Sequence, residues 1–198
     1  MATVEFFFDI SSPWSYLGFH GIRNLCRGKD AELKLRPALV GGVFNTVNPS
    51  VYAARENPVP AKVAHDPKDR RDWARYYGVE IGNPPVFPVN SVKALRGCFL
   101  AEEQGSLEEF ADAAFTAYWA DLKDISQGDV MLQIADQVGI TGFEEGITRQ
   151  DIKDRLRTNT DELIARGGYG VPTSFVNETD MYFGNDRLLL VGEAIARL

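Results

Sequence analysis

The feature that most constrains the fold of this chain is the junction at Ser12-Pro13, at the end of the aromatic run of residues 4–10. A short run of aromatic and β-branched residues predicts a buried strand. A small polar residue followed by proline predicts a helix start. The fixed φ angle of proline suits the first helical position, and the backbone N–H that proline lacks would have no partner there. The Ser12 hydroxyl would then face unpaired backbone N–H groups at the positive end of the helix dipole, where an anion is favoured. A plain helix N-cap is the simpler interpretation.

Composition narrows the class of protein. The 198 residues suit one ordinary domain, with or without an insertion. A net charge of −7 without a basic cluster argues against nucleic acid and anionic membranes as partners. We identify no signal peptide and no apolar run that could span a bilayer, so a cytoplasmic protein is expected. Cys26 and Cys98 lack metal-ligand spacing, and His20 and His65 add little, so we expect reduced core cysteines and no metal site.

Strand signals cluster at the two ends of the chain, and helix signals fill the middle. A helix follows the first strand and places His20 on its solvent face. Residues 31–40 alternate as a second strand, and a loop rich in glycine, asparagine and proline is expected over residues 41–60. Further helices are predicted to begin at Asp66-Pro67, near Val92, at the capping box Ser106-Leu107-Glu108-Glu109, near Met131 and at Thr148, the last ending at Gly167-Gly168.

The C-terminal end returns to strand signals. Residues 172–176 and 181–183 predict two strands joined by a hairpin, and a last helix follows them. The order β-α-β, helical segment, β-β-α predicts an α/β protein with a thioredoxin-like domain built from residues 1–44 and 168–198. An all-helical insertion of residues 45–167 interrupts that domain.

Three segments, each at the expected place in this order, carry a family resemblance. They are Phe7-Phe8-Asp9-Ile10-Ser11-Ser12-Pro13-Trp14-Ser15-Tyr16-Leu17, Gly170-Val171-Pro172-Thr173 and Phe183-Gly184-Asn185-Asp186-Arg187-Leu188, with weaker support from residues 41–44, 60–62 and 87–90 and from Asn48. Together they resemble the 2-hydroxychromene-2-carboxylate isomerase family, which belongs with kappa-class glutathione transferases and DsbA-like proteins. The resemblance spans essentially the whole chain. It implies a DsbA-like architecture, glutathione as cofactor and a homodimer.

The resemblance also implies that Ser12 is the catalytic residue. In redox proteins of the thioredoxin type, cysteines occupy the positions that Ser12 and Ser15 hold here, so this chain cannot shuttle electrons through them. The Ser12 hydroxyl and the helix N-terminus can instead lower the pKa of a bound glutathione thiol. No histidine lies nearby in sequence to activate Ser12 as a nucleophile. Ser15 is either a support for Ser12 or a plain solvent contact.

The expected cofactor-binding residues come from the same resemblance. They are Ser12, Asn48, Lys62, Val171, Pro172, Phe183, Gly184, Asn185 and Asp186. Val171-Pro172 resembles the cis-proline turn of thioredoxin-like folds, whose backbone groups pair with an extended peptide; an ordinary turn proline is the alternative. Backbone N–H groups near Asn185 and the Asp186 carboxylate would bind the γ-glutamyl end, although Asn185 is also a candidate N-cap.

The substrate side of the site is less well defined. Lys62 and Asn48 are expected to bind either the glycyl carboxylate of glutathione or a substrate carboxylate, with a solvated lysine as the alternative. Asn90 is a weaker candidate for a substrate contact. Trp14 and Phe44, with Tyr77 and Phe87, are candidates for an apolar substrate pocket, and core packing is the alternative for each.

The function that follows is a glutathione-dependent isomerisation of an aromatic or conjugated carboxylate such as 2-hydroxychromene-2-carboxylate. Reversible addition of the thiolate would turn a conjugated double bond into a single bond that rotates. One alternative is a kappa-like glutathione transferase or peroxidase, and another is a non-catalytic thioredoxin-fold binding module. His65-Asp66 and residues 82–85 depart from the family pattern, which leaves the substrate open.

Overall fold

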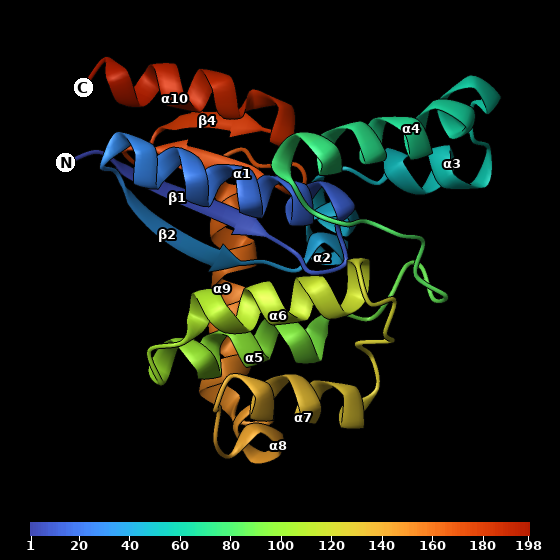
Figure 1. Ribbon diagram of the computed structural model, residues 1–198, viewed down its shortest axis with the longest axis vertical. Coiled ribbons are helices and arrows are strands. Elements are labelled where there is room, and N and C mark those ends of the chain that lie inside the picture. The colour runs from blue at the N-terminus through green and yellow to red at the C-terminus, as the bar shows by residue number, and fades with distance from the viewer.

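The computed structural model describes residues 1–198 and contains a four-stranded mixed sheet with the strand order β2-β1-β3-β4. Strand β1 (Thr3–Phe8) runs parallel to β2 (Glu32–Pro37). On its other edge, β1 pairs antiparallel with β3 (Thr173–Val176), which pairs antiparallel with β4 (Asp180–Phe183). The C-terminal strands therefore join the sheet that the N-terminal strand begins, as predicted, and both termini lie at the same end of the molecule (Figure 1).

Ten α-helices and one short 3-10 helix accompany the sheet. They are α1 (Pro13–Lys29), α2 (Val40–Val47), α3 (Ser50–Glu56), α4 (Pro60–Tyr77), α5 (Val92–Glu103), α6 (Leu107–Trp119), α7 (Gly128–Gln137), α8 (Phe143–Gly146), α9 (Gln150–Ala165), η1 (Asn185–Arg187) and α10 (Leu188–Ala196). Helices α1 and α10 pack on one face of the sheet, and α2 and α9 pack on the other. Helices α5 to α8 lie beyond β2, and α3 and α4 project as an arm (Figure 1). None of these helices is both long enough and apolar enough to cross a membrane.

Strand β1 is buried on both faces because helices cover both faces of the sheet. Phe6 and Phe8 belong to a large core cluster that continues into α5, α6 and α7. Phe7 points to the opposite face, where its ring meets Phe175 of β3 edge-on with centroids 5.7 Å apart. One hydrophobic core thus joins the sheet to the helical layer, and the division at residues 44 and 168 stays a prediction.

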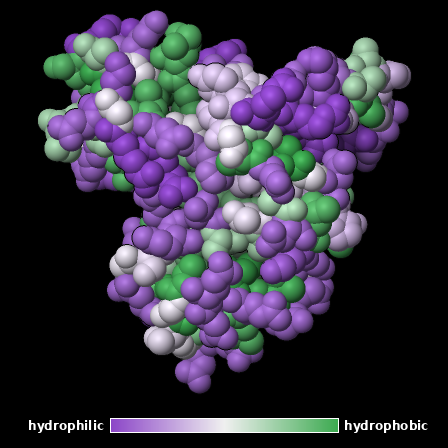
Figure 2. Space-filling model, viewed as in Figure 1, coloured by the Kyte–Doolittle hydropathy of each residue, from purple (hydrophilic) through white to green (hydrophobic).

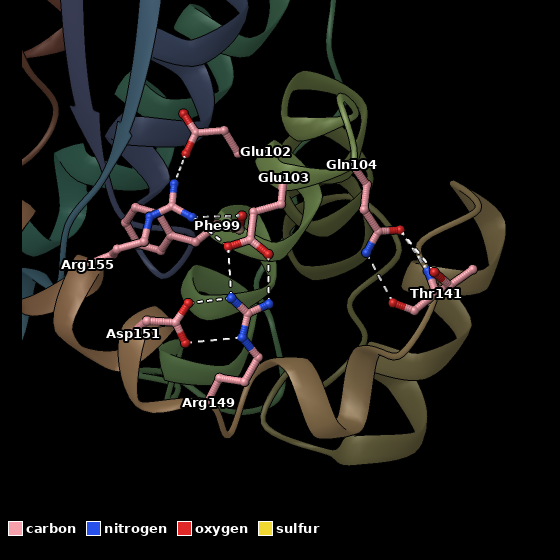
Figure 3. Close-up of polar contacts among 8 residues, drawn as sticks. All are labelled: Phe99, Glu102, Glu103, Gln104, Thr141, Arg149, Asp151 and Arg155. Atoms are coloured by element: carbon pink, nitrogen blue, oxygen red, sulfur yellow. Dashed lines mark hydrogen bonds and ion pairs between the residues drawn. The ribbon is translucent and has the colours of Figure 1, made fainter.

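Polar contacts on the surface of the helical layer align its helices (Figure 3). Arg149, just before α9, makes two hydrogen bonds to the Glu103 carboxylate of α5 at 2.8 and 3.1 Å and also pairs with Asp151. Arg155 of α9 pairs with Glu102 and Glu103 on the same end of α5. Exposed ion pairs contribute little to stability. We therefore assign the stability of this layer to the apolar core beneath them.

Three local predictions in the middle of the chain are wrong. Residues 41–60 are not a loop but form most of α2, α3 and the start of α4. Packing against α9 overrides the weak helix propensity of α2, and α4 packs on α1. Helix α4 begins at Pro60, which occupies a first-turn position, so Pro67 lies inside the helix instead of opening it. Ser106 precedes α6 without the extended backbone of a cap and makes no side-chain cap hydrogen bond, so the capping box does not form.

His20 is not solvated, contrary to the prediction. Helix α6 packs across the face of α1 that was expected to meet water, and Arg23 on that face pairs with Glu108 of α6. The His20 ring lies edge-on to Tyr16, and its Nε2 is 3.8 Å from a carboxylate oxygen of Asp112. Burial lowers the pKa of His20.

The two cysteines are free and buried, as predicted. Burial raises the pKa of both thiols, that of Cys26 to about 11. Both are therefore packing residues that stay protonated near neutral pH.

Candidate active site

A cavity of about 630 Å³, here called the Ser12 cavity, lies where the β1–α1 turn meets the arm of α3 and α4. Its walls also include α2, residues 83–91 and the segment before β3. On the face drawn in Figure 2, apolar surface lies beneath the arm that α3 and α4 form. The cavity therefore brings together segments from both ends and the middle of the chain.

Ser12 is the N-cap of α1 and lies on the wall of this cavity. Its side-chain oxygen accepts the backbone N–H of Ser15 at 3.1 Å, and Pro13 occupies the first helical turn, as predicted. The nearest acceptor for its own proton is the carbonyl of Val171, at 3.5 Å, which is a long hydrogen bond. The cap thus uses an acceptor site of the hydroxyl and leaves its proton free to turn toward an anion.

Val171 faces Ser12 across the cavity wall, and its bond to Pro172 is cis, as predicted. The Val171 N–H makes no hydrogen bond within the chain, and its carbonyl has only the long contact with Ser12. Pro172 lies behind the wall, where its carbonyl accepts the N–H of Gly184 at 2.9 Å. The backbone groups of Val171 are therefore available to an extended peptide, in the manner of one added strand residue.

Ser15 and Asp9 support the turn that carries Ser12. Ser15 is fully buried, which excludes the solvent-contact alternative, and its hydroxyl oxygen lies 3.4 Å from the backbone nitrogen of Asp9, which donates to it. Asp9 is fully buried and lines the cavity. Its carboxylate accepts the Ser11 N–H at 2.9 Å and hydroxyl at 2.8 Å, and the N–H of Val40 at 2.9 Å. Asp9 therefore fastens the β1–α1 turn to the start of α2.

Asp9 is a residue that the sequence analysis missed. Burial raises the pKa of its carboxyl group, although hydrogen bonds from Ser91, Ser11 and Val40 oppose that shift. The available signal was a single acidic residue at the end of an aromatic run, directly before the helix start. Such a carboxylate needs buried hydrogen-bond donors, and only the fold shows which segments supply them.

Aromatic side chains form much of the remaining wall. Trp14, Phe44 and Phe87 all line the Ser12 cavity. Phe183 lines it too and packs against Tyr169 with ring centroids 4.5 Å apart. A wall of this kind suits a flat apolar or aromatic ligand and reduces the access of water.

The structure gathers some of the predicted residues and separates others. Ser12, Trp14, Phe44, Asn48, Asn90, Val171 and Phe183 line the Ser12 cavity. Lys62 is exposed on α4 outside it, and Tyr77 packs on Trp73, with ring centroids 5.6 Å apart, away from the cavity. Asn48 donates its amide to the carbonyl of Tyr169 at 3.1 Å, which holds it on the wall.

Asn185 and Asp186 line a different space, a cavity of about 900 Å³ between α1, α4 and α10. Asn185 is buried, and its side-chain nitrogen has no hydrogen-bond partner. Gly184 precedes them with a φ of 104°, and the Asp186 carboxylate folds back beside it and pairs with Arg187 at 2.6 Å. The residues expected at the γ-glutamyl end thus line a separate cavity and not the Ser12 cavity.

Comparison with known proteins agrees with this architecture. The family model described as "DSBA-like thioredoxin domain" matches residues 3–196. The 2-hydroxychromene-2-carboxylate isomerase of Pseudomonas putida is 26% identical over 202 residues, which cover 98% of this chain and 95% of that protein. Glutathione S-transferase kappa 1 of Homo sapiens is 26% identical over 215 residues, covering 98% and 90% of the two chains.

Among solved structures, a 2-hydroxychromene-2-carboxylate isomerase superimposes with a TM-score of 0.82 at 23% identity. The match covers 98% of this chain and 95% of that one. The resemblance stated from the sequence and the predicted DsbA-like thioredoxin fold are thereby confirmed.

Proposed function

The chain belongs to the DSBA-like thioredoxin domain family, and we propose that it is a glutathione-dependent isomerase of conjugated aromatic carboxylates. Its relatives carry the names of isomerases and of glutathione transferases, two kinds of enzyme. The observation that carries the proposal is the Ser12 hydroxyl, which lies at the N-terminus of α1 beside the free backbone groups of Val171. Those groups fit a short extended peptide that carries a thiol.

Ser12 and α1 account for the activation of the thiol. When bound, glutathione supplies a thiolate that adds reversibly to a conjugated double bond. A free thiol of this kind has a pKa of about 8.5, so most of it is protonated at neutral pH. The Ser12 proton and the positive end of the α1 dipole, where the Trp14 N–H has no partner within the chain, both favour the charged form, so they would lower that pKa.

The other cavity residues account for binding and orientation. The backbone N–H and carbonyl of Val171, which have no other partner than the long contact with Ser12, would hold the cysteinyl part of glutathione. Trp14, Phe44 and Phe87 enclose the aromatic part of the substrate and exclude water. We also propose that Asn185 and Asp186, which line the second cavity, hold the γ-glutamyl end.

A glutathione transferase is the second candidate, because the kappa-class relatives carry that name. It would use Ser12 and Val171 in the same way and differ in consuming the thiol. A dithiol oxidoreductase is excluded, since both positions of the pair are serine.

The test is to incubate the protein with glutathione and either 2-hydroxychromene-2-carboxylate or chlorodinitrobenzene while total free thiol is measured. Turnover of the first compound with glutathione conserved supports the isomerase. Stoichiometric loss of thiol with the second compound identifies the transferase instead. If calorimetry detects no glutathione binding, both enzyme functions are contradicted, and the non-catalytic thioredoxin-fold binding module is the alternative that stands.

A further inference from the structure

The charged groups on the wall of the Ser12 cavity are not all paired with one another. Four charged residues line it, namely Asp9, Arg55, Asp66 and Arg70. Asp66 is paired with Arg70, and the Asp9 carboxylate is occupied by hydrogen bonds from Ser11 and Val40. Arg55 makes no ion pair, and its guanidinium lies 5.7 Å from the ring centroid of Phe44. One cation without an acidic partner therefore faces the cavity in a protein whose net charge is −7.

Arg70 has hydrogen-bonding capacity to spare. Its side chain is only 16% exposed, and its Nε lies 2.9 Å from a carboxylate oxygen of Asp66. The one hydrogen bond it makes is a long one, 3.4 Å from Nη2 to the side-chain oxygen of Asn83. A guanidinium carries five N–H donors in a rigid fork that matches a carboxylate. A mostly buried arginine with free donors on a cavity wall is suited to bind such a group.

Two polar side chains from different segments contact the Arg70 guanidinium. Asp66 lies one helical turn before Arg70 on α4 and faces its Nε. Asn83, in the turn-rich residues 82–85, accepts a hydrogen bond from its Nη2. These two contacts orient the guanidinium on the cavity wall.

Lys62, expected from the sequence to bind a carboxylate, lies outside the cavity, whereas Arg55 and Arg70 line it together with aromatic side chains. We propose that Arg70, assisted by Arg55, forms the carboxylate-binding subsite of the Ser12 cavity and selects substrates with an acidic group beside a conjugated aromatic body. The inference rests on the proposed function and names the residues that set substrate class. The carboxylate comes from the substrate or from the glycyl end of glutathione, and the experiment separates these sources.

The first arm measures binding of benzylidenepyruvate and of benzylideneacetone, in which a methyl group replaces the carboxylate. No glutathione is present, so no thiol adds to the double bond and the result does not depend on the cofactor. We expect Arg70→Gln to weaken benzylidenepyruvate binding about ten- to a hundredfold, the loss typical of a charge-assisted hydrogen bond. Binding of benzylideneacetone should change less than about twofold, because it has no charge to lose.

The second arm measures binding of glutathione and of its glycyl ethyl ester by calorimetry. If Arg70→Gln weakens glutathione but not the ester, the subsite exists and its occupant is the glycyl carboxylate. If benzylidenepyruvate alone is weakened, the occupant is the substrate carboxylate. The second outcome supports the proposal in full, whereas the first keeps the carboxylate subsite and contradicts its part in selecting substrates.

Arg71→Gln is the matched control, because Arg71 is the next residue of α4, carries the same charge, is exposed and does not line the cavity. Arg55→Gln removes an exposed side chain and keeps the proposal testable should Arg70→Gln fold poorly. Wild-type protein that binds no carboxylate probe would overturn the proposal. Arg70→Gln and Arg55→Gln proteins with the same affinity for benzylidenepyruvate as Arg71→Gln would also overturn it. An equal loss of affinity for benzylidenepyruvate and benzylideneacetone would overturn it as well. Turnover with conserved glutathione alongside such a result would leave the proposed function standing.

Discussion

The side-chain oxygen of Ser12 accepts the backbone N–H of Ser15 at 3.1 Å, so the helix cap and the proposed thiolate contact use different parts of one hydroxyl. The cap takes a lone pair, whereas a thiolate would take the proton, whose present acceptor, the Val171 carbonyl, is 3.5 Å away. Ser12 can therefore stabilise α1 and bind an anion at the same time. The two interpretations of this residue are compatible.

Because Ser12 has two roles, Ser12→Ala should lose both helix-cap stability and, in the glutathione complex, thiolate stabilisation. Removal of the cap should lower the free energy of unfolding by about 1 kcal/mol. Ser12→Thr keeps both a cap oxygen and a proton, so it should retain most of the stability. Urea denaturation of the three proteins measures this effect, and equal stability of Ser12→Ala and wild type would show that the cap contributes nothing.

Asp9 should make the stability of the protein depend on pH in a definite direction. Its pKa is raised in the folded state, so the folded protein holds a proton more tightly than the unfolded chain does. The stability that Asp9 contributes is therefore greatest below about pH 3.9, the ordinary pKa, and falls as the pH rises toward the raised value.

Asp9→Asn removes this titration. It also leaves one acceptor too few for Ser11 and Val40, which should cost about 1–3 kcal/mol. Urea denaturation across a pH series should show the difference between wild type and Asp9→Asn shrinking as the pH rises from about 4. A difference that stays constant with pH would contradict a raised pKa at Asp9.

Asp186→Ala should weaken glutathione binding roughly tenfold, because the Asp186 carboxylate would lose a charge-assisted contact with the γ-glutamyl ammonium. This loss of affinity is at the lower end of the range for charge-assisted contacts, because the Asp186 side chain is 45% exposed and already paired with Arg187. Glu193→Ala, at an exposed position of α10, is the control. Calorimetry that finds the same affinity in both variants would remove Asp186 from the cofactor site.

The predictable parts of the fold are those whose signals are local. The run before Ser12 and the proline after it predict a strand and a helix start from neighbouring residues alone. The cis turn at Val171-Pro172 was predicted from the family resemblance. The register of β1 against β3 pairs Phe7 with Thr173 and Glu5 with Phe175, which brings the rings of Phe7 and Phe175 together on one face.

The parts that could not be predicted depend on contacts between distant segments. His20 is covered because α6 crosses α1, and α2 is helical because α9 packs on it. Arg70 resembles any other surface arginine in the sequence, and only the fold turns it toward the Ser12 cavity. The part of the cavity wall that the motifs at Ser12 and Val171-Pro172 form was therefore predictable from the sequence. The part that α3 and α4 form was not.

The central claim is that Ser12 stabilises the thiolate of bound glutathione. The most direct measurement is a pH titration of thiolate absorbance in the glutathione complex of wild type, Ser12→Ala and Ser12→Thr. Loss of one hydrogen-bond donor to an anion costs about 1.5–3 kcal/mol, so the titration midpoint of Ser12→Ala should rise by about 1–2 pH units. Ser12→Thr should remain near wild type, and part of the shift should survive in Ser12→Ala because the N-terminus of α1 remains. A Ser12→Ala midpoint equal to that of wild type would show that Ser12 is a helix cap alone.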